Sequence, residues 1–320
     1  MVRILAVIVV YKMNALQTPS FVTLQRSSEA LSSERLCLKI VLYDNSCDAK
    51  DPGPMPEGVE YHAADQNAGL SSAYNYALGL ARSQGYDWLL TLDQDSRLPS
   101  DFLDRTTQIA AVAQADPSIG AILPLIVESG KRHSPYWFFA GAFPRYYKAE
   151  ASGVSIHETY AFNSGAMLRV SALIEVGGYN PWFWLDYSDG YIFRQLHLHG
   201  KRAFIAGDLQ VGHDFATTNL EAKVSVSRYR NMRMAESAFW DLEMGTLAGF
   251  ERTLGLVKVM FIHVLFGHDP EYRRVTFEFL KQRLFWSKKK RLEAWEEETR
   301  KKFPWLRSRV PPFIDLSSEG

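Results

Sequence analysis

Residues 88–99 read WLLTLDQDSRLP, and in this stretch an apolar run ends at two carboxylates, Asp93 and Asp95, that are one residue apart. If Trp88 to Leu92 form a strand that continues briefly, both carboxylates point to the same side, because side chains alternate along a strand. Mg²⁺ and Mn²⁺ prefer oxygen ligands and commonly bind one or two carboxylates together with substrate phosphate oxygens. The stretch therefore predicts a divalent-cation site at a strand end; the alternative is a chance turn or capping cluster.

The sequence before this stretch alternates between apolar runs and helical patterns. Residues 3–10 form a continuous run rich in Val and Ile, which is typical of a strand covered on both faces of a parallel sheet. The other predicted elements are strands at 36–46 and around 59–62, and helices at about 20–33 and at 71–85. With the strand at 88–93, the order β, α, β, β, α, β is that of a nucleotide-binding α/β pattern.

Polar or aromatic side chains follow three of the predicted strands where they end. Tyr11 follows the first strand, Asp44 ends the second, and Asp93 ends the strand at 88–93. In open α/β sheets, ligands bind beyond the carboxyl ends of the strands. We therefore expect these three residues to border one ligand site.

The sequence after Asp95 continues the α/β pattern and then becomes helical. We expect Ser100 to cap a helix over 101–116 and the aromatic stretch 128–160 to be irregular. Further predictions are a strand at 161–170, helices at 171–178 and 190–200, and a strand at 201–213. From about Asn219 onward helical periodicity dominates, and Lys and Arg accumulate toward the end.

Composition limits the classes of function. The 320 residues, 47% of them apolar, suffice for one large core or a core with an appended unit. The 36 basic and 36 acidic residues cancel, so no global attraction to nucleic acid is indicated. The two cysteines lack the spacing of a zinc site, and the apolar N-terminal run is too short to span a bilayer and has no signal cleavage site. These features favour a cytoplasmic protein.

Several phosphate-binding and catalytic motifs are missing from the sequence. It contains no G-x-G-x-x-G fingerprint, no G-x-x-x-x-G-K-[ST] loop, no G-x-S-x-G elbow and no H-E-x-x-H pair. A bound nucleotide diphosphate would need its charge balanced by something other than a glycine-rich loop. A divalent cation held by Asp93 and Asp95 is the obvious candidate.

Six stretches, in order and spacing, resemble the inverting glycosyltransferases of family two with the GT-A fold, most closely their rhamnosyltransferase-like branch. They are VIVVYK (7–12), LYDNS (42–46), NAGLSSAYNYAL (67–78), LLTLDQDS (89–96), FNSGAMLRVSALIEVGGYN (162–180) and FWLDYSDGYIFRQLHLHGK (183–201). The resemblance covers about residues 3–215. It implies an α/β fold of the GT-A nucleotide-diphospho-sugar transferase type, a Rossmann-like mixed sheet flanked by helices with a helical C-terminal extension.

The extent of the resemblance and the change to helical periodicity near Asn219 together predict a division of the chain. Residues 1–218 would form the catalytic domain, with a nucleotide-binding half at 1–98 and an acceptor-binding half at 99–218. Residues 219–320 would form the helical C-terminal region, as a membrane-surface or oligomerisation element.

The resemblance assigns donor-binding roles to residues of the first half. Asp44 matches the acid that accepts a hydrogen bond from the nucleotide base, and Tyr11 matches an aromatic position near that base. Asn67 and Gly69 match an N-x-G element, where the chain turns toward the donor and a bulky side chain would obstruct it. Without the resemblance, these residues are equally typical of a turn-forming Asp-Asn pair, a core aromatic residue and an ordinary loop.

The metal and base roles follow from the same resemblance. Asp93 matches the acid of the ribose and metal shell, Asp95 the direct metal ligand, and His213 a histidine that completes the metal shell in some relatives. Asp189 matches the general base for the incoming hydroxyl, and Asp186 is the competing candidate. The alternative for both is a pair of acids stabilised at a helix N-terminus.

Residues near the expected sugar site are also matched. Asn163, with Ser164 and Gly165, matches an element near the acceptor and donor sugar. Trp182, Phe183 and Trp184 could offer faces for a sugar, or they could be core residues.

The C-terminal region carries a local excess of positive charge. Residues 254–267 are apolar but too few to span a membrane. Residues 281–310 contain eleven Lys and Arg against four Glu, with aromatic residues interleaved. This pattern suits binding in the plane of an anionic membrane surface, or equally an amphipathic helix that packs on the catalytic domain or on a second subunit.

Taken together, the sequence predicts an inverting glycosyltransferase that depends on Mg²⁺ or Mn²⁺. It would move a sugar, rhamnose from dTDP-rhamnose, from a nucleotide-diphosphate donor to a growing cell-surface polysaccharide or lipid-linked glycan. The alternatives are transfer of galactofuranose or a hexose, a non-catalytic nucleotide-sugar or glycan-binding module, and a structural partner protein that uses the basic tail. We expect a cytoplasmic location, peripheral at the inner face of the plasma membrane, a homo-oligomer as a further option, and no nucleic-acid partner.

Overall fold

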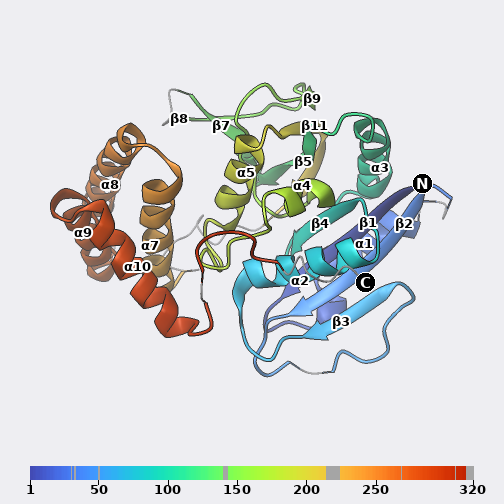
Figure 1. The fold of residues 1–320 in the computed structure, drawn as a ribbon, viewed down its shortest axis with the longest axis horizontal. Coiled ribbons are helices and arrows are strands. Elements are labelled where there is room, and N and C mark those ends of the chain that lie inside the picture. The colour runs from blue at the N-terminus through green and yellow to red at the C-terminus, as the bar shows by residue number, and fades with distance from the viewer. Residues whose placement is uncertain are drawn as a thin grey trace. The chain divides into compact units, whose positions relative to one another are not determined.

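The computed structural model describes residues 1–29, 31, 34–49, 51–139, 143–213, 224–267, 269–306 and 308–314 (Figure 1). The chain divides into two compact units. Unit 1 comprises Met1–Trp137, Arg145–Asp214 and Ser308–Gly320, and unit 2 comprises Phe138–Pro144 and Phe215–Arg307. The predicted boundary between residues 218 and 219 lies outside the described residues.

Unit 1 is built on a mixed sheet. Among the described residues it has nine strands in the order β3-β2-β1-β4-β10-β5-β11-β9, with β6 paired to β5. The strands are β1 (Val2–Val10), β2 (Leu36–Asp44), β3 (Val59–Ala63), β4 (Trp88–Asp93), β5 (Ile119–Glu128), β6 (Lys131–Ser134), β9 (Gly153–Val154), β10 (Ala166–Arg169) and β11 (Arg202–Gly212). Strands β1 to β4 pair in parallel, whereas β10 runs antiparallel to both β4 and β5. This confirms the predicted mixed α/β fold.

Helices cover the sheet of unit 1 (Figure 1). They are η1 (Ala15–Gln17), α1 (Pro19–Glu29), α2 (Gly69–Ser83), α3 (Phe102–Ala113), α4 (Val170–Glu175) and α5 (Ser188–Leu198). Helix α2 packs on β1 and β4, and α3 packs on β1, β5 and β11. Strand β1 is paired along both edges, and all but one of its residues are buried. The Val- and Ile-rich composition of residues 3–10 follows from this position, because no edge or face of the strand is left to water.

Three sequence predictions differ from the structure. The stretch 128–160 contains β6, β9 and the two-stranded sheet of β7 (Tyr136–Phe139) and β8 (Phe143–Tyr146), so it is not irregular. Helix α3 has Asp101 as its N-cap, so the prediction for Ser100 is wrong. Strand β5 lies in a stretch for which no element was predicted, although it pairs with three other strands.

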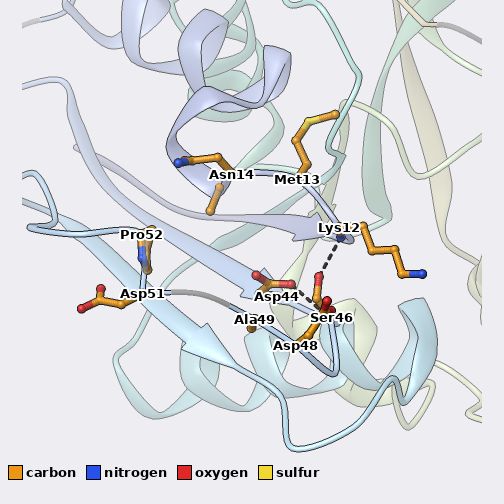
Figure 2. A pocket seen from close by; sticks show the side chains of 10 residues that line it. Lys12, Met13, Asn14, Asp44, Ser46, Asp48, Ala49, Asp51 and Pro52 are labelled. Atoms are coloured by element: carbon orange, nitrogen blue, oxygen red, sulfur yellow. Dashed lines mark hydrogen bonds between the residues drawn. The ribbon is translucent and has the colours of Figure 1, made fainter.

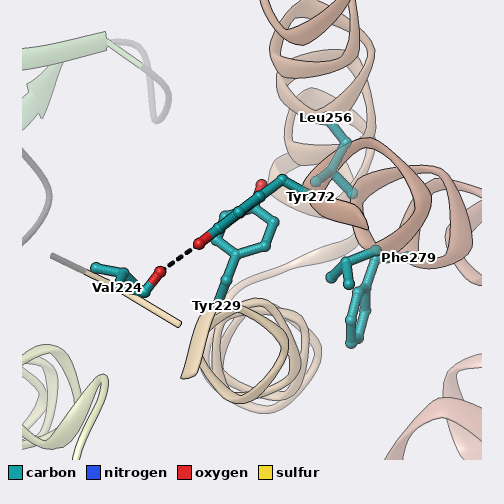
Figure 3. Packing of buried hydrophobic residues seen from close by; sticks show 6 residues of the cluster. Val224, Tyr229, Leu256, Tyr272 and Phe279 are labelled. Atoms are coloured by element: carbon teal, nitrogen blue, oxygen red, sulfur yellow. Dashed lines mark hydrogen bonds between the residues drawn. The ribbon is translucent and has the colours of Figure 1, made fainter. Parts of the chain in front are cut away.

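Unit 2 is helical, as predicted for the C-terminal region. Its described helices are α7 (Val226–Glu243), α8 (Thr246–Leu265), α9 (Pro270–Phe285) and α10 (Lys288–Lys302). Figure 3 shows Tyr229 of α7, Leu256 of α8, and Tyr272 and Phe279 of α9, which pack in one core with Val224 and Val275. None of the described helices is both long enough and apolar enough to cross a membrane.

Candidate active site

The parallel register of the sheet brings three predicted residues to one edge. Val10, the last residue of β1, pairs with Asp44 at the end of β2, and Val9 pairs with Asp93 at the end of β4. Tyr11 follows Val10 directly, so it leaves β1 between the two acids. The carboxyl ends of β2, β1 and β4 therefore form the edge at which an α/β sheet binds ligands.

Asp44 lies at the wall of a pocket with a volume of about 410 Å³ (Figure 2). The pocket is lined by Lys12, Met13, Asn14, Ala15, Asp44, Ser46, Asp48, Ala49, Asp51 and Pro52. The Asp44 carboxylate accepts a hydrogen bond from the backbone N–H of Ser46 at 2.8 Å and one from the Tyr61 hydroxyl at 2.9 Å. A carboxylate has about four acceptor positions, so Asp44 keeps acceptor capacity for a ligand in the pocket.

Tyr61 is a neighbour of Asp44 that the sequence analysis missed. Burial first, and then the hydrogen bond to Asp44, raise the pKa of the Tyr61 hydroxyl to about 12. Tyr61 therefore remains a donor and holds the Asp44 carboxylate in place. Strand β3 positions it, because Tyr61 pairs with Leu42, two residues before Asp44 on β2. The signal in the sequence was a tyrosine within a predicted strand, because the hydroxyl of a half-buried tyrosine needs a hydrogen-bond partner.

Tyr11 lies at the end of β1 with 44% of its surface exposed. It is not among the residues that line the pocket beside Asp44. Its backbone N–H donates to the side-chain oxygen of Gln94 at 2.8 Å. The middle residue of the D-x-D stretch thus ties the end of β1 to the turn after β4, a role that the sequence analysis did not assign to it.

Asp93 is half-buried and accepts hydrogen bonds from two side chains. One donor is the hydroxyl of Ser164, and the other is the hydroxyl of Tyr74, at 3.4 Å. Burial raises the pKa of Tyr74, with a further contribution from the charge of Asp93, so Tyr74 stays protonated and donates. These bonds connect β4 to helix α2 and to the loop before β10.

The other carboxylate of this stretch, Asp95, faces His213. Its Oδ1 lies 3.4 Å from Nδ1 of His213, which follows the end of β11. Backbone hydrogen bonds in both directions between Arg97 and Gly212, at 2.8 and 3.0 Å, hold the two segments together. The structure thus joins two predicted metal ligands that are more than a hundred positions apart in the chain.

The Asp95–His213 pair fits a divalent cation whose remaining ligands are not protein groups. An oxygen and a nitrogen donor 3.4 Å apart can occupy adjacent positions around an ion at distances of about 2.1 Å. Within the described residues, no three His, Cys, Asp or Glu side chains gather closely enough to hold an ion by themselves. Diphosphate oxygens and water would have to complete the shell, as is usual for Mg²⁺.

Asn67 and Gly69 shape the N-terminus of α2. The Asn67 side chain accepts a hydrogen bond from the Gly69 N–H at 3.1 Å. Gly69 has φ of +83°, and a Cβ placed on it would lie 2.2 Å from the carbonyl oxygen of Trp184. That carbonyl accepts the N–H of Leu70 at 2.6 Å. The close approach of the Trp184 backbone therefore requires glycine here, and the predicted contact of both residues with a donor stays a prediction.

Asp189 lies in the first turn of α5. The backbone N–H of Gly190 donates to its Oδ1 at 2.7 Å. Burial raises the pKa of the Asp189 carboxyl to about 7, and the negative charges of Asp93 and Asp186 add to the rise, against the effect of the Gly190 N–H. A carboxyl whose pKa lies near neutral pH is suited to accept a proton during a reaction.

Asn163 is buried and supports the start of α5 from inside. Its side-chain oxygen accepts from the hydroxyl of Tyr179 at 2.9 Å, and its amide lies 3.4 Å from the hydroxyl of Ser188. Both polar ends are therefore bonded within the protein. The structure places Asn163 next to the residue that precedes Asp189, where it can position the base.

The predicted sugar platforms include two core residues. Trp182 and Phe183 are fully buried, so the hypothesis that their faces pack on a sugar is wrong. The indole N–H of Trp182 donates to the backbone carbonyl of Ser308 at 2.7 Å. Trp184 is partly exposed, so the packing of a sugar on its ring stays a prediction.

The Glycosyl transferase family 2 model matches residues 46–177. The matched stretch contains Asp93, Asp95 and Asn163 and makes up less than half of the chain. The fold agrees: a crystal structure of GalNAc-T7 with UDP, GalNAc and Mn²⁺ superposes with a TM-score of 0.55 at 14% identity, covering 95% of this chain. The chain spans 59% of the length of that protein chain.

A second solved structure, residues 1–349 of TarS from S. aureus, has a TM-score of 0.46 at 10% identity, covering 94% of this chain and 91% of that one. No curated protein matches the chain by sequence. The likeness to GalNAc-T7, at 14% identity, is one of fold.

Proposed function

We propose that the protein is an inverting, divalent-cation-dependent glycosyltransferase with Asp189 as its general base. The observation that carries this proposal is geometric: Asp44 and Asp93 end the two strands that flank β1, at one edge of the sheet. Asp95, two residues after Asp93, lies 3.4 Å from His213. Asp189 is close enough to Asp93 for that charge to add to the raised pKa of its carboxyl. A carboxyl with a pKa near neutral pH therefore lies within electrostatic reach of the strand ends that carry Asp44, Asp93 and Asp95. Inversion needs one such base, which takes the proton of the acceptor hydroxyl as that oxygen attacks the anomeric carbon.

The donor would lie along the strand ends. Asp44 would accept the N3–H of a uracil or thymine base in the pocket beside it. Asp95 and His213 would hold the cation, whose chemistry is to neutralise charge on the departing diphosphate. Asp93, fixed by Ser164 and Tyr74, would support the ribose. Leaving-group stabilisation should be the larger effect, because general-base catalysis typically contributes about 10²–10⁴-fold.

We further propose a specific donor and acceptor. The resemblance to the rhamnosyltransferase-like branch favours dTDP-rhamnose, with a growing polysaccharide or lipid-linked glycan as acceptor. We also propose that the protein acts in the cytoplasm. Both cysteines, Cys37 and Cys47, are free, and free thiols are typical of a reducing compartment.

A donor panel with purified full-length protein tests the proposal. The panel comprises dTDP-rhamnose, UDP-galactofuranose and UDP-hexoses, each with and without Mn²⁺, and the readouts are melting temperature and release of nucleoside diphosphate. We expect one donor to raise the melting temperature only with Mn²⁺, because a ligand that binds the folded state stabilises it.

Variants separate binding from chemistry. Asp189→Asn should bind the same donor and lower its release by about 10²–10⁴-fold. Asp95→Asn and His213→Ala should weaken Mn²⁺ binding, measured by titration with nucleoside diphosphate present, by about 10–100-fold. The control is Asp104→Asn, which changes a half-buried acid of α3 that pairs with Arg35 at 3.0 Å outside the site. Donor binding without any release would favour a non-catalytic binding module, and the absence of any donor-induced shift would overturn the proposal.

A further inference from the structure

Helix α8 presents an exposed apolar stripe in unit 2. Its exposed residues include Phe250, Leu254, Lys258, Phe261 and Leu265, which follow one another in steps of three or four, the period of one helix face. Phe261 is 72% exposed and Leu265 is 79% exposed. On the opposite side, Leu256 packs into the core of unit 2. The helix is therefore apolar on two faces, of which one is occupied by the core.

Helix α9, which packs beside α8, also carries exposed apolar residues. Phe277, Lys281, Leu284 and Phe285 are exposed, again in helical steps, and Phe285 is 75% exposed. The two helices lie side by side: the guanidinium of Arg283 donates to the carbonyl of Gly249 at 3.1 Å, which joins the end of α9 to the start of α8. Figure 3 shows the inner side, where Leu256 and Phe279 approach Tyr229 of α7. The nine exposed residues named for α8 and α9 are called the outer face below.

The charges on the outer face are positive. Lys258 and Lys281 interrupt the apolar residues, and three exposed lysines follow at 288–290, where α10 begins. The fully exposed acids described in this helix pair, Asp269 and Glu271, lie at the turn between the helices. Glu251 and Glu278 are half-buried, and Glu278 pairs with Arg230 at 2.7 Å. Asp269 caps α9, and Glu271 lies 4.0 Å from Arg274. Apolar side chains with interspersed lysines are the composition of a surface that lies in the headgroup region of an anionic bilayer.

We propose that the outer face binds the surface of an anionic lipid bilayer, with α8 and α9 lying in the plane of the membrane. Phenylalanine and leucine side chains would enter the boundary between headgroups and acyl chains, and Lys258 and Lys281 would pair with lipid phosphates. A second copy of the chain fits the face less well, because a symmetric contact brings the same lysines toward each other. This inference does not rest on the transferase activity.

The structure also changes which residues of the C-terminal region are assigned to membrane binding. Within the predicted segment 281–310, Trp295 and Phe303 are buried, and Arg283 and Arg291 bind the buried carboxylate of Asp241. Further along α10, Lys301 forms ion pairs with Glu297 and Glu298 on its own helix. Helix α10 packs on α7. Membrane binding is therefore assigned to the outer face and to the lysines at the start of α10.

Vesicle flotation with the full-length protein tests the assignment. The vesicles are phosphatidylcholine alone and an equal mixture of phosphatidylcholine and phosphatidylglycerol. We expect binding to the mixed vesicles that weakens as salt rises. Phe261→Ser with Leu265→Ser should lower the partition coefficient roughly tenfold or more. Lys258→Gln with Lys281→Gln should lower it roughly 25-fold, or about fivefold for each lysine.

Matched controls come from unit 1. Val112→Ser with Ile156→Ser removes two apolar side chains that are 75% and 87% exposed, and Lys131→Gln with Lys148→Gln removes two exposed lysines. Both controls should bind vesicles like the unchanged protein, and circular dichroism verifies folding of all four variants. Binding that is lost equally in the controls, or the absence of binding to either vesicle, overturns the proposal. Self-association without lipid that the Phe261 and Leu265 variant abolishes would assign the face to a second copy instead.

Discussion

Asp189 shows how neighbouring groups set the chemistry of one residue. Desolvation and the charges of Asp93 and Asp186 favour the neutral carboxyl, whereas the Gly190 N–H favours the carboxylate. The folded pKa of about 7 lies above the ordinary value of 3.8. The stabilisation from binding a proton is therefore complete below about pH 4 and is lost as the pH rises through 7. The raised pKa that suits Asp189 to act as a base therefore lowers the stability of the folded protein as the pH rises through 7.

The pH dependence of activity follows from this carboxyl. The value of kcat/KM should rise about tenfold per pH unit below pH 7 and level off above it, because only the carboxylate accepts the acceptor proton. Asp186→Asn removes one of the charges that raise the pKa of Asp189, so its acid limb should move to lower pH. Steady-state kinetics between pH 5 and 9 measures both, and a flat profile would contradict the assignment of the base.

The N-terminus of α2 binds the backbone of the segment that precedes α5. The N–H groups of Leu70 and Ser71 donate to the Trp184 carbonyl at 2.6 and 3.4 Å, and the Ser71 hydroxyl donates to the Phe183 carbonyl at 2.7 Å. Further along the helix, both ends of the Asn75 amide bind the backbone of Tyr179. Helix α2 thereby holds the loop that leads to Asp186 and Asp189, because the first N–H groups of a helix need partners.

Gly69→Ala tests this connection. The added Cβ would meet the Trp184 carbonyl at a φ of +83°, so we expect a loss of at least about 2 kcal/mol in the free energy of unfolding. Gly79→Ala is the matched control in the same helix, since a Cβ there meets nothing within 4 Å. It should stabilise the protein by about 0.5–1 kcal/mol. Urea denaturation measures both, and equal midpoints for the two variants would refute the role given to Gly69.

At the scale of the whole molecule, each of the two units is stabilised internally by different interactions. Unit 1 has a sheet in which β1, paired along both edges, is almost entirely buried. The helices of unit 2 share a buried polar network besides their apolar core. The carboxylate of Asp241 forms ion pairs with Arg283 at 2.9 Å and with Arg291 at 2.7 Å. Burial lowers the pKa of the Arg283 guanidinium, and the charge of Asp241 opposes that shift. One carboxylate of α7 thus connects α9 and α10.

Asp241→Asn should weaken unit 2 strongly. The substitution leaves two buried guanidinium groups without their counter-ion, which costs about 3–5 kcal/mol in the free energy of unfolding. Glu293→Gln is the control, because it removes an exposed ion pair with Lys289 at 3.8 Å and should cost no more than about 0.5 kcal/mol. Thermal unfolding followed by circular dichroism compares them. Similar melting temperatures for the two variants would show that the network does not stabilise the fold.

Local patterns in the sequence determined much of the α/β order and part of the candidate site. Buried parallel strands produce continuous apolar runs, so β1, β2 and β4 were predictable, as were the acids at their ends. Strand β5 is as apolar as these strands but was not predicted. The short strands within 128–160 were not predicted because their apolar and polar residues alternate too little to show a period. The separation of the chain into helical and α/β parts was also visible in the periodicity.

Only the tertiary structure decided which residues meet. The hydrogen bond from Tyr61 to Asp44 and the contact of Gly69 with Trp184 join segments that no sequence pattern connected. The same holds for the burial of Trp182 and Phe183, and for the exposed face of α8. Asp95 and His213 were expected in one metal shell from the resemblance, and the structure added their distance of 3.4 Å. The physical reason is that periodicity reports that a side chain is apolar or polar, whereas burial, pKa and ligand geometry depend on what the rest of the chain packs against it.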